Sequence, residues 1–357
     1  MRLLVQAAPH AKPPEGWNRA TGENIVAAPV PDFLTPRLLV KNLGQVKKIV
    51  RETLTETEAI HLRVSCFLGN VVWRALEPGR PYGVEVVADP YDSFAPGAFH
   101  HPLRPALRAW VPRELKNQCA NATAATYVTK DALQRRYPAS PGALSTYFSD
   151  VDLTGNAFVD APRKAPDAGK TFQLVFVGTL AQLYKAPDVL ISAVAECAQE
   201  GLDLQLNLIG SGRHRDELEA QAKTLGIAER VIFRGQMADR HPVQKELDAA
   251  DLFVLPSHQE GLPRAMVEAM ARALPCIGST VGGIPELLPP EDLVPPGDAD
   301  ALAKKIGEVL RDPNRMARMS AHSLQTAHEY EEGVLRARRE EFYSYVQEKT
   351  AEWMKTK

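Results

Sequence analysis

The chain of 357 residues has few cysteines and no apolar run long enough to cross a bilayer. Its cysteines, Cys66, Cys119, Cys197 and Cys276, include no CxxC pair and have no neighbouring histidine pattern. This spacing argues against a disulfide framework and against a zinc site, and favours a reducing compartment. The amino end lacks the apolar segment of a secretion signal. We therefore expect a cytoplasmic protein that holds no metal.

The sequence also lacks a strong excess of either charge, since its formal net charge is −2. A net charge this close to zero gives no reason to expect a nucleic-acid partner. The distribution is uneven, because residues 1–165 carry 20 Lys and Arg against 15 Asp and Glu, and the remainder carries 22 against 29. A more basic first half suits peripheral contact with an anionic membrane or an acidic acceptor, and ordinary scatter of surface charge is the alternative.

A chain of this length suits two domains. Residues 161–171, rich in proline and charge, have the composition of a linker. Strand and helix signals alternate after it, which predicts a parallel α/β sheet with right-handed crossovers. We expect an N-terminal domain over residues 1–165 and a C-terminal domain over 166–330. A final helix, within 331–357, is expected to pack back toward the first domain.

The pattern predicts the following elements. In the second half, strands are expected at 172–178, 204–209, 231–233, 252–255 and 275–278, and helices at 188–200, 213–225 and 241–249. In the less regular first half, strands are expected at 61–65, 84–88 and 124–128, and helices at 103–119, interrupted at Pro112, and at 130–136.

Two carboxylates separated by seven residues, Glu260 and Glu268, stand between two of these strands. Their turn should lie at the carboxyl edge of the sheet, where open α/β sheets bind ligands. Pro263 suits the first turn of the following helix, whose free amides can hold an anion. A carboxylate one turn further in can bind vicinal hydroxyls. The arrangement predicts a site for a nucleotide sugar.

Four motifs occur in the order found in one enzyme family, the retaining GT-B glycosyltransferases of the family-4 type, which this chain resembles. They are Phe176-Val-Gly-Thr-Leu with Lys185, Leu208-Ile-Gly-Ser-Gly212, Glu260-x7-Glu268 and Val281-Gly-Gly-Ile-Pro-Glu286. The match is strongest over 172–330 and moderate over 60–160. Each motif alone is weak, and four in register across about half a chain are a strong signal.

The resemblance implies two Rossmann-like domains that face each other across a cleft. A sugar would pass from a UDP- or GDP-sugar to an acceptor hydroxyl with retention of configuration, without a cofactor or divalent metal. A lysine and a helix N-terminus would stabilise the departing diphosphate. The acceptor would be a lipid-linked or saccharide intermediate of polysaccharide or glycolipid synthesis, at the cytoplasmic face of the membrane.

The resemblance also implies roles for single residues. Glu268 would bind the ribose hydroxyls, Glu260 would act beside the donor sugar, and Lys185 would meet the diphosphate. The alternatives are an exposed helix acid, an acid at a helix N-terminus and a solvated lysine. Thr179, after the strand-ending Gly178, stands where the family often has arginine.

Further donor contacts are implied around this motif. Arg264 would supply the missing cation, and a surface salt bridge is its alternative. Gly210 and Gly212 would border the base or sugar, or simply form a tight turn. Arg234 and Gly235 lie where the family's backbone contacts the base.

The first half departs from the family. Residues 1–25 contain no glycine-rich loop, so we advance the hypothesis that the first β-α unit is absent. Many relatives have a histidine close to the reacting sugar after a central strand. Asp89 stands there in this chain, and we expect it to take over that contact as a catalytic residue; an Asp-Pro turn is the alternative reading. These departures leave open a catalytically weak relative that only binds nucleotide. An NAD-dependent enzyme is disfavoured, because no Gly-x-Gly-x-x-Gly is followed by an acid at the required distance.

Overall fold

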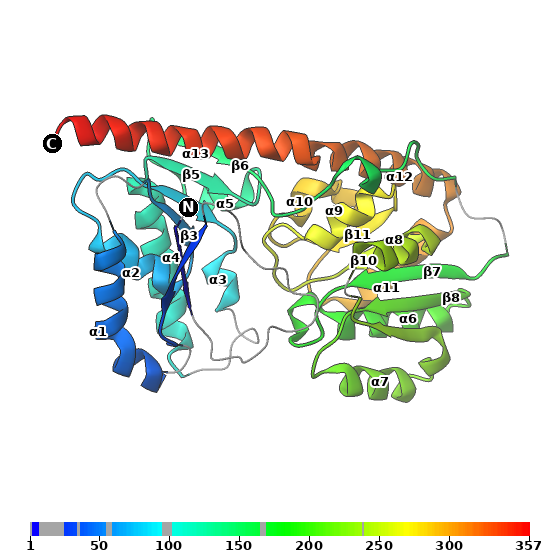
Figure 1. Cartoon of the computed structure of the whole chain (residues 1–357). Coiled ribbons are helices and arrows are strands. Elements are labelled where there is room, and N and C mark those ends of the chain that lie inside the picture. The colour runs from blue at the N-terminus through cyan, green and yellow to red at the C-terminus, as the bar shows by residue number, and fades with distance from the viewer. Residues whose placement is uncertain are drawn as a thin grey trace.

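The computed structural model describes residues 2–6, 25–33, 36–54, 59–94, 102–164, 169–237 and 239–357. Two α/β domains lie side by side, and one long C-terminal helix runs along both of them (Figure 1). The predicted α/β fold with parallel sheets is confirmed.

The C-terminal domain is built on a six-stranded parallel sheet in the order β12-β11-β10-β7-β8-β9. Its central strands are runs of buried apolar residues, as expected of a sheet covered by helices on both faces. The strands are β7 (Phe172–Val177), β8 (Leu204–Ile209), β9 (Val231–Gly235), β10 (Leu252–Leu255), β11 (Cys276–Ser279) and β12 (Leu293–Val294). The helices are α6 (Pro187–Gln199), α7 (Arg215–Thr224), α8 (Arg240–Ala249), α9 (Arg264–Ala271), α10 (Ile284–Leu287), α11 (Ala299–Leu310) and α12 (Pro313–Ala327).

The described strands of the N-terminal domain form a four-stranded parallel sheet, β3-β4-β5-β6, and a separate parallel pair, β1-β2. The strands are β1 (Arg2–Gln6), β2 (Val26–Val30), β3 (His61–Val64), β4 (Gly83–Val86), β5 (Ala124–Tyr127) and β6 (Leu144–Tyr147). The helices are α1 (Pro36–Thr53), α2 (Phe67–Ala75), α3 (Pro90–Ser93), α4 (Arg104–Asn121) and α5 (Ala132–Arg136). The sequence did not predict β1, β2, β6, α1 or α2. Most of the segment between β1 and β2 lies outside the described residues, so the hypothesis of an absent β-α unit stays a prediction.

The predicted interruption at Pro112 was wrong, because α4 is one continuous helix with this proline inside it. A proline removes a single backbone hydrogen bond and crowds the preceding turn. The next turns of α4 bury Leu115, Gln118 and Cys119 against the domain core. This packing holds the helix together across the proline.

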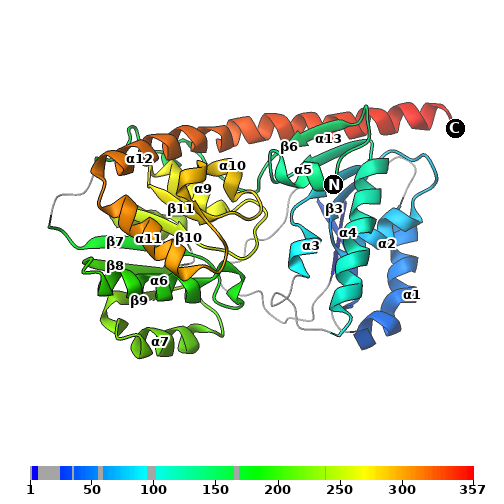
Figure 2. The ribbon, with the colours of Figure 1, turned by 180° about the vertical axis from the view of Figure 1, so that it is seen from behind.

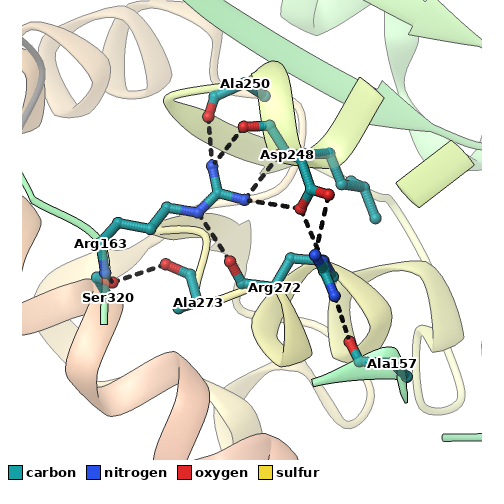
Figure 3. A network of polar contacts seen from close by, with 8 residues as sticks. Ala157, Arg163, Asp248, Ala250, Arg272, Ala273 and Ser320 are labelled. Atoms are coloured by element: carbon teal, nitrogen blue, oxygen red, sulfur yellow. Dashed lines mark hydrogen bonds and ion pairs between the residues drawn. The ribbon is translucent and has the colours of Figure 1, made fainter. Parts of the chain in front are cut away.

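The segment that joins the domains, between β6 and β7, is anchored on the C-terminal domain by Arg163 (Figure 3). Its guanidinium donates hydrogen bonds to the carbonyls of Leu247, Ala250 and Arg272, at 2.6 to 2.9 Å. These carbonyls lie at or just beyond the carboxyl ends of α8 and α9, where backbone acceptors lack partners within the helix. The Arg163 N–H also donates to Ser320 Oγ at 2.7 Å. The chain is therefore fixed to the second domain before residue 165.

Helix α13 (Glu332–Lys355) returns to the N-terminal domain, as Figures 1 and 2 show. It starts beside the joining segment, where the Glu332 N–H donates to the Leu153 carbonyl at 2.9 Å. Further along, Phe342 and Val346 are buried against β4, and a Cβ on Gly83 would come within 2.8 Å of the Phe342 ring. The glycine thus lets α13 lie close to the N-terminal sheet.

Candidate active site

A pocket of about 680 Å³ lies at the carboxyl edge of the C-terminal sheet, where the loops after β7 and β10 meet the start of α9. This is the position expected for ligand binding in an open α/β sheet. Six of the residues selected from the sequence line it, namely Gly178, Thr179, Lys185, Glu260, Arg264 and Glu268. The carboxylate motif and the lysine motif therefore belong to one site.

Lys185 and Glu260 form an ion pair inside this pocket, with 2.7 Å between Nζ and Oε1. The Ser257 hydroxyl donates to the same carboxylate oxygen at 2.9 Å. The two charged side chains are only 14% and 8% exposed. Lys185 is thus not the solvated surface lysine that was its alternative reading.

Glycines hold the loops of the pocket in close contact. A Cβ on Gly178 would lie 2.5 Å from Lys185 Cδ, so the glycine makes room for the lysine to fold over it. A Cβ on Gly210 would lie 1.8 Å from the Gly178 carbonyl oxygen, and one on Gly212 would lie 1.9 Å from the Ala181 nitrogen. Gly210 and Gly212 are not part of the pocket wall, and they allow the loop after β8 to rest on the loop after β7.

Glu268 lies in the second turn of α9, half-buried in the pocket. Burial raises the pKa of its carboxyl, and the nearby Arg240 and Arg264 partly oppose that shift. Its alternative reading as an exposed helix residue is therefore wrong. Arg264 opens the same helix, is exposed, and forms no ion pair with any other described residue, so the surface salt bridge is not found.

Sequence reasoning missed other members of the pocket wall, above all Tyr184 and Arg240. Arg240 begins α8, and its guanidinium pairs with Asp152 of the joining segment at 2.8 Å. Burial and the charge of Glu260 raise the pKa of Tyr184. The sequence could have indicated Arg240, because it is a basic residue at the start of a helix that follows a strand of the parallel sheet.

Arg234 and Gly235 lie outside the pocket wall. The Arg234 guanidinium donates to Asn207 Oδ1 at 3.0 Å and lies 3.4 Å from Glu246. The Gly235 carbonyl accepts the Gly210 N–H at 2.8 Å. Both residues connect β9 to its neighbours, and their contact with a base stays a prediction.

Asp89 lies at the end of β4 and caps the short helix α3. Its carboxylate accepts the Tyr91 N–H at 2.8 Å and the Tyr137 hydroxyl at 2.5 Å, and it pairs with Arg136. It is buried and does not line the pocket. The structure thus shows Asp89 in the turn-forming role that was the alternative to a catalytic one. Its catalytic role stays a prediction.

The domains touch beside the pocket through the glycine-rich motif at 281–286. The Glu286 carboxylate accepts the N–H groups of Lys130, Asp131 and Ala132, at 2.5 to 3.0 Å, where α5 begins. Nearby, a Cβ on Gly261 would come within 2.7 Å of the Val87 carbonyl oxygen, after β4. The loop of Glu260 therefore lies directly against the carboxyl edge of the N-terminal sheet.

Among the residues that the structure describes, no group of three or more His, Cys, Asp or Glu side chains is placed to hold a metal ion. No helix in the same residues combines the length and apolar character needed to span a membrane.

Residues 171–312 match the family described as glycosyl transferases group 1. Protein CapJ of Staphylococcus aureus is 27% identical over 81% of this chain and 72% of its own length. A GDP-mannose-dependent alpha-(1-6)-phosphatidylinositol monomannoside mannosyltransferase of Mycolicibacterium smegmatis is 33% identical, with 38% of each chain matched. The chain carries a glycosyltransferase group 1 domain. Its resemblance to these enzymes, inferred from the motifs, is confirmed.

The structure of Anabaena HepE in complex with UDP-glucose has the same fold, with a TM-score of 0.61 and 19% identity. The match covers 94% of this chain and 92% of HepE. The predicted GT-B fold, with two Rossmann-like α/β domains, is therefore confirmed.

Proposed function

We propose that this chain transfers a sugar from a UDP- or GDP-sugar to an acceptor hydroxyl, with retention of configuration and without a divalent metal. The observation that carries the proposal is the pocket that combines Lys185, Glu260 and Glu268 at the start of a helix. One cation for a diphosphate, one carboxylate for vicinal hydroxyls and one for the sugar are the groups that such a donor requires.

The diphosphate would be held by cations from three elements. Lys185 comes from the loop after β7, Arg240 from the start of α8 and Arg264 from the start of α9. The free N–H groups at the start of α9, which lie at the positive end of the helix dipole, face the same part of the pocket. Arg240 and Arg264 thereby replace the arginine that the family often has at Thr179. Negative charge on the leaving diphosphate would be stabilised by these groups.

The ion pair between Lys185 and Glu260 implies that the diphosphate of the donor binds before the sugar is positioned. When a diphosphate binds the amine of Lys185, Glu260 loses its ion-pair partner. The carboxylate of Glu260 can then accept hydrogen bonds from the hydroxyls of the sugar. Glu268 on the next turn of the helix would accept hydrogen bonds from the ribose hydroxyls, because an ionised carboxylate is an acceptor only.

Relatives support the substrate classes. The HepE structure is a complex with UDP-glucose, and the mycobacterial relative is a GDP-mannose-dependent phosphatidylinositol monomannoside mannosyltransferase. We propose a saccharide or lipid-linked acceptor, in polysaccharide or glycolipid synthesis, at the cytoplasmic face of the membrane. The four cysteines are free, which fits a reducing compartment.

A second candidate is a relative that binds the nucleotide without turnover. Two observations favour it: Thr179 replaces a cation, and the carboxylate of Asp89 is already bound by Arg136 and Tyr137.

The test is incubation of the full chain with a panel of UDP-, GDP- and ADP-sugars, with and without saccharide and lipid-linked acceptors, followed by mass detection of products. We expect one donor to be consumed and its sugar to appear on an acceptor with the same anomeric configuration. Activity should persist in a chelator. Binding of a nucleotide with no turnover of any donor would favour the second candidate. A chain whose melting temperature responds to none of these nucleotides would contradict both.

A further inference from the structure

Arg240 occupies an unfavourable position for a cation. It is the first residue of α8, and the first turn of that helix contains no acidic side chain. The positive end of the helix dipole lies there and repels a guanidinium. Arg240 nevertheless lines the donor pocket. An anion from another part of the chain would therefore stabilise this arginine at the pocket wall.

The joining segment supplies that anion. Arg240 Nη2 donates a hydrogen bond to Asp152 Oδ2 at 2.8 Å. The side chains of Arg240 and Asp152 are 38% and 63% exposed, so solvent screens the pair and its contribution to the stability of the fold is small. Its effect on the direction of the arginine is larger, because a long side chain that is already held loses less rotamer freedom when it binds a ligand.

The backbone on both sides of Asp152 is fixed in place. Val151 and Leu153 are buried, and Asp152 between them is exposed, which is the alternation of an extended chain. The Leu153 carbonyl accepts the Glu332 N–H at 2.9 Å, at the start of α13. The carboxylate of Asp152 therefore extends from a well-defined point of the joining segment.

Asp152 and Arg240 both act on Glu268, the carboxylate proposed to bind ribose. Burial raises the pKa of Glu268, the charge of Arg240 lowers it, and the charge of Asp152 raises it. The three side chains thus lie close enough to interact. Arg240 and Glu268 line the pocket, whereas Asp152 does not. A diphosphate in the pocket would therefore meet the guanidinium, with the carboxylate of Asp152 behind it.

The pair also leaves donors of Arg240 available to a ligand. A guanidinium has five N–H groups in a planar fork, and the hydrogen bond to Asp152 is made at Nη2. The other N–H groups can bind phosphate oxygens, for which the fork geometry is well suited. Asp152 thus fixes the guanidinium without occupying all of it.

We propose that Asp152 is a positioning residue of the donor site, which holds the guanidinium of Arg240 where the diphosphate of a nucleotide sugar binds. This inference rests on the proposed function. It extends that function by giving the joining segment a part in donor affinity, although the residues that line the pocket come from the C-terminal domain. It also explains how a cation from α8 takes the place of the one missing at Thr179.

Calorimetric titration of the full chain with UDP and GDP tests the proposal. For the diphosphate that the wild type binds more tightly, Asp152→Ala should lower the affinity about threefold, the effect of an exposed ion pair. Arg240→Ala should lower it about tenfold, because a charge-assisted contact to phosphate is lost. Once Arg240 is alanine, adding Asp152→Ala should have no further effect. Asp152→Asn keeps an acceptor for the guanidinium and should recover part of the loss.

The matched control is Asp150→Ala. Asp150 is an exposed aspartate of the same segment that pairs with Arg63 of the N-terminal sheet, and its removal should leave nucleotide affinity unchanged. Unchanged or tighter binding by Asp152→Ala, the same loss with and without Arg240, or an equal loss in the control would overturn this inference and leave the proposed function standing. A wild type that binds neither nucleotide would overturn both.

Discussion

The two halves of the molecule use their charged side chains differently. In the C-terminal half, Lys185, Arg240, Glu260 and Glu268 converge on an open pocket. At the facing edge of the N-terminal half, Asp89 is occupied by its neighbours in the fold. The charged groups of the C-terminal half thus line an open pocket that a ligand can enter, whereas Asp89 is buried and bound within the N-terminal half.

This difference explains why function could be inferred from one half only. A site that recognises a diphosphate and a ribose needs particular residue types at particular spacings, and these leave motifs in the sequence. The N-terminal half contributes a wall beside Glu260, which many sequences can supply. The acceptor site that the proposed function requires in this half would therefore leave no comparable pattern.

The largest expected effect is on the junction of the halves. Replacing Arg163 with alanine would leave the carbonyls of Leu247, Ala250 and Arg272 without their donor. We expect the free energy of unfolding to fall by about 3 kcal/mol, because charge-assisted hydrogen bonds to buried acceptors are lost. Urea unfolding measures this. As a control, Arg336→Ala removes only an exposed pair within α13 and should cost less than about 0.5 kcal/mol. Equal effects would show that Arg163 does not anchor the junction.

The next effect concerns the donor half. Lys185→Ala should weaken binding of a nucleoside diphosphate by about 100-fold, since a charge-assisted contact to phosphate is lost. Lys185→Arg should keep most of the affinity, and Lys223→Ala, at an exposed site, should keep all of it. Calorimetric titration gives these values.

The same variant tests the ion pair. Lys185→Ala leaves the carboxylate of Glu260, which is 8% exposed, without its cation, and should lower the melting temperature. Adding Glu260→Ala should restore part of that loss. Additive effects of the two changes would contradict the pairing.

A smaller effect is expected at the contact between the halves. Glu286→Ala removes the cap on three N–H groups at the start of α5 and should cost about 1 kcal/mol of stability. Nucleotide affinity should change less than twofold, because the pocket lies wholly in the C-terminal domain. A large loss of affinity would show that the halves cooperate in donor binding.

The smallest effect is the dependence of donor binding on pH. Burial raises the pKa of Glu268, and only the ionised carboxylate accepts hydrogen bonds from ribose. Affinity should therefore fall as the pH is lowered, starting at a higher pH than an ordinary glutamate, whose pKa is about 4.3, would cause. Glu268→Gln should flatten the profile. Titration of the nucleotide phosphate is common to both proteins, so the difference between the two profiles isolates Glu268. Parallel profiles would contradict this role.

Much of the C-terminal half could be predicted from the sequence. Strands β7 and β10 are mostly apolar runs bounded by turn residues, which is the pattern of a buried parallel strand, and β8 has Gln205 and Asn207 between buried apolar residues. The motifs then place Lys185 and Glu268 at the correct edge. Their meeting in one pocket depends on the pairing of β10 with β7, which the sequence did not predict.

Tertiary contacts could not be predicted. The pairing of Lys185 with Glu260 joins residues 75 positions apart, and the place of Arg240 depends on how α8 packs beside the sheet. In the first half, β1 and β2 were missed, and β2 is exposed at most positions with no buried alternation to mark it. The break at Pro112 was predicted from a local rule that packing overrides.

The most direct test of the central claim is titration of UDP and GDP into the wild type, Glu268→Ala and Glu341→Ala, with melting temperatures measured in parallel. Glu341 is an exposed acid of α13 and serves as the matched control. We expect at least one nucleotide to bind the wild type and the control equally. Glu268→Ala, still folded, should bind that nucleotide at least tenfold more weakly. Equal affinity in all three proteins, or no binding by the wild type, would contradict a donor site at Glu268.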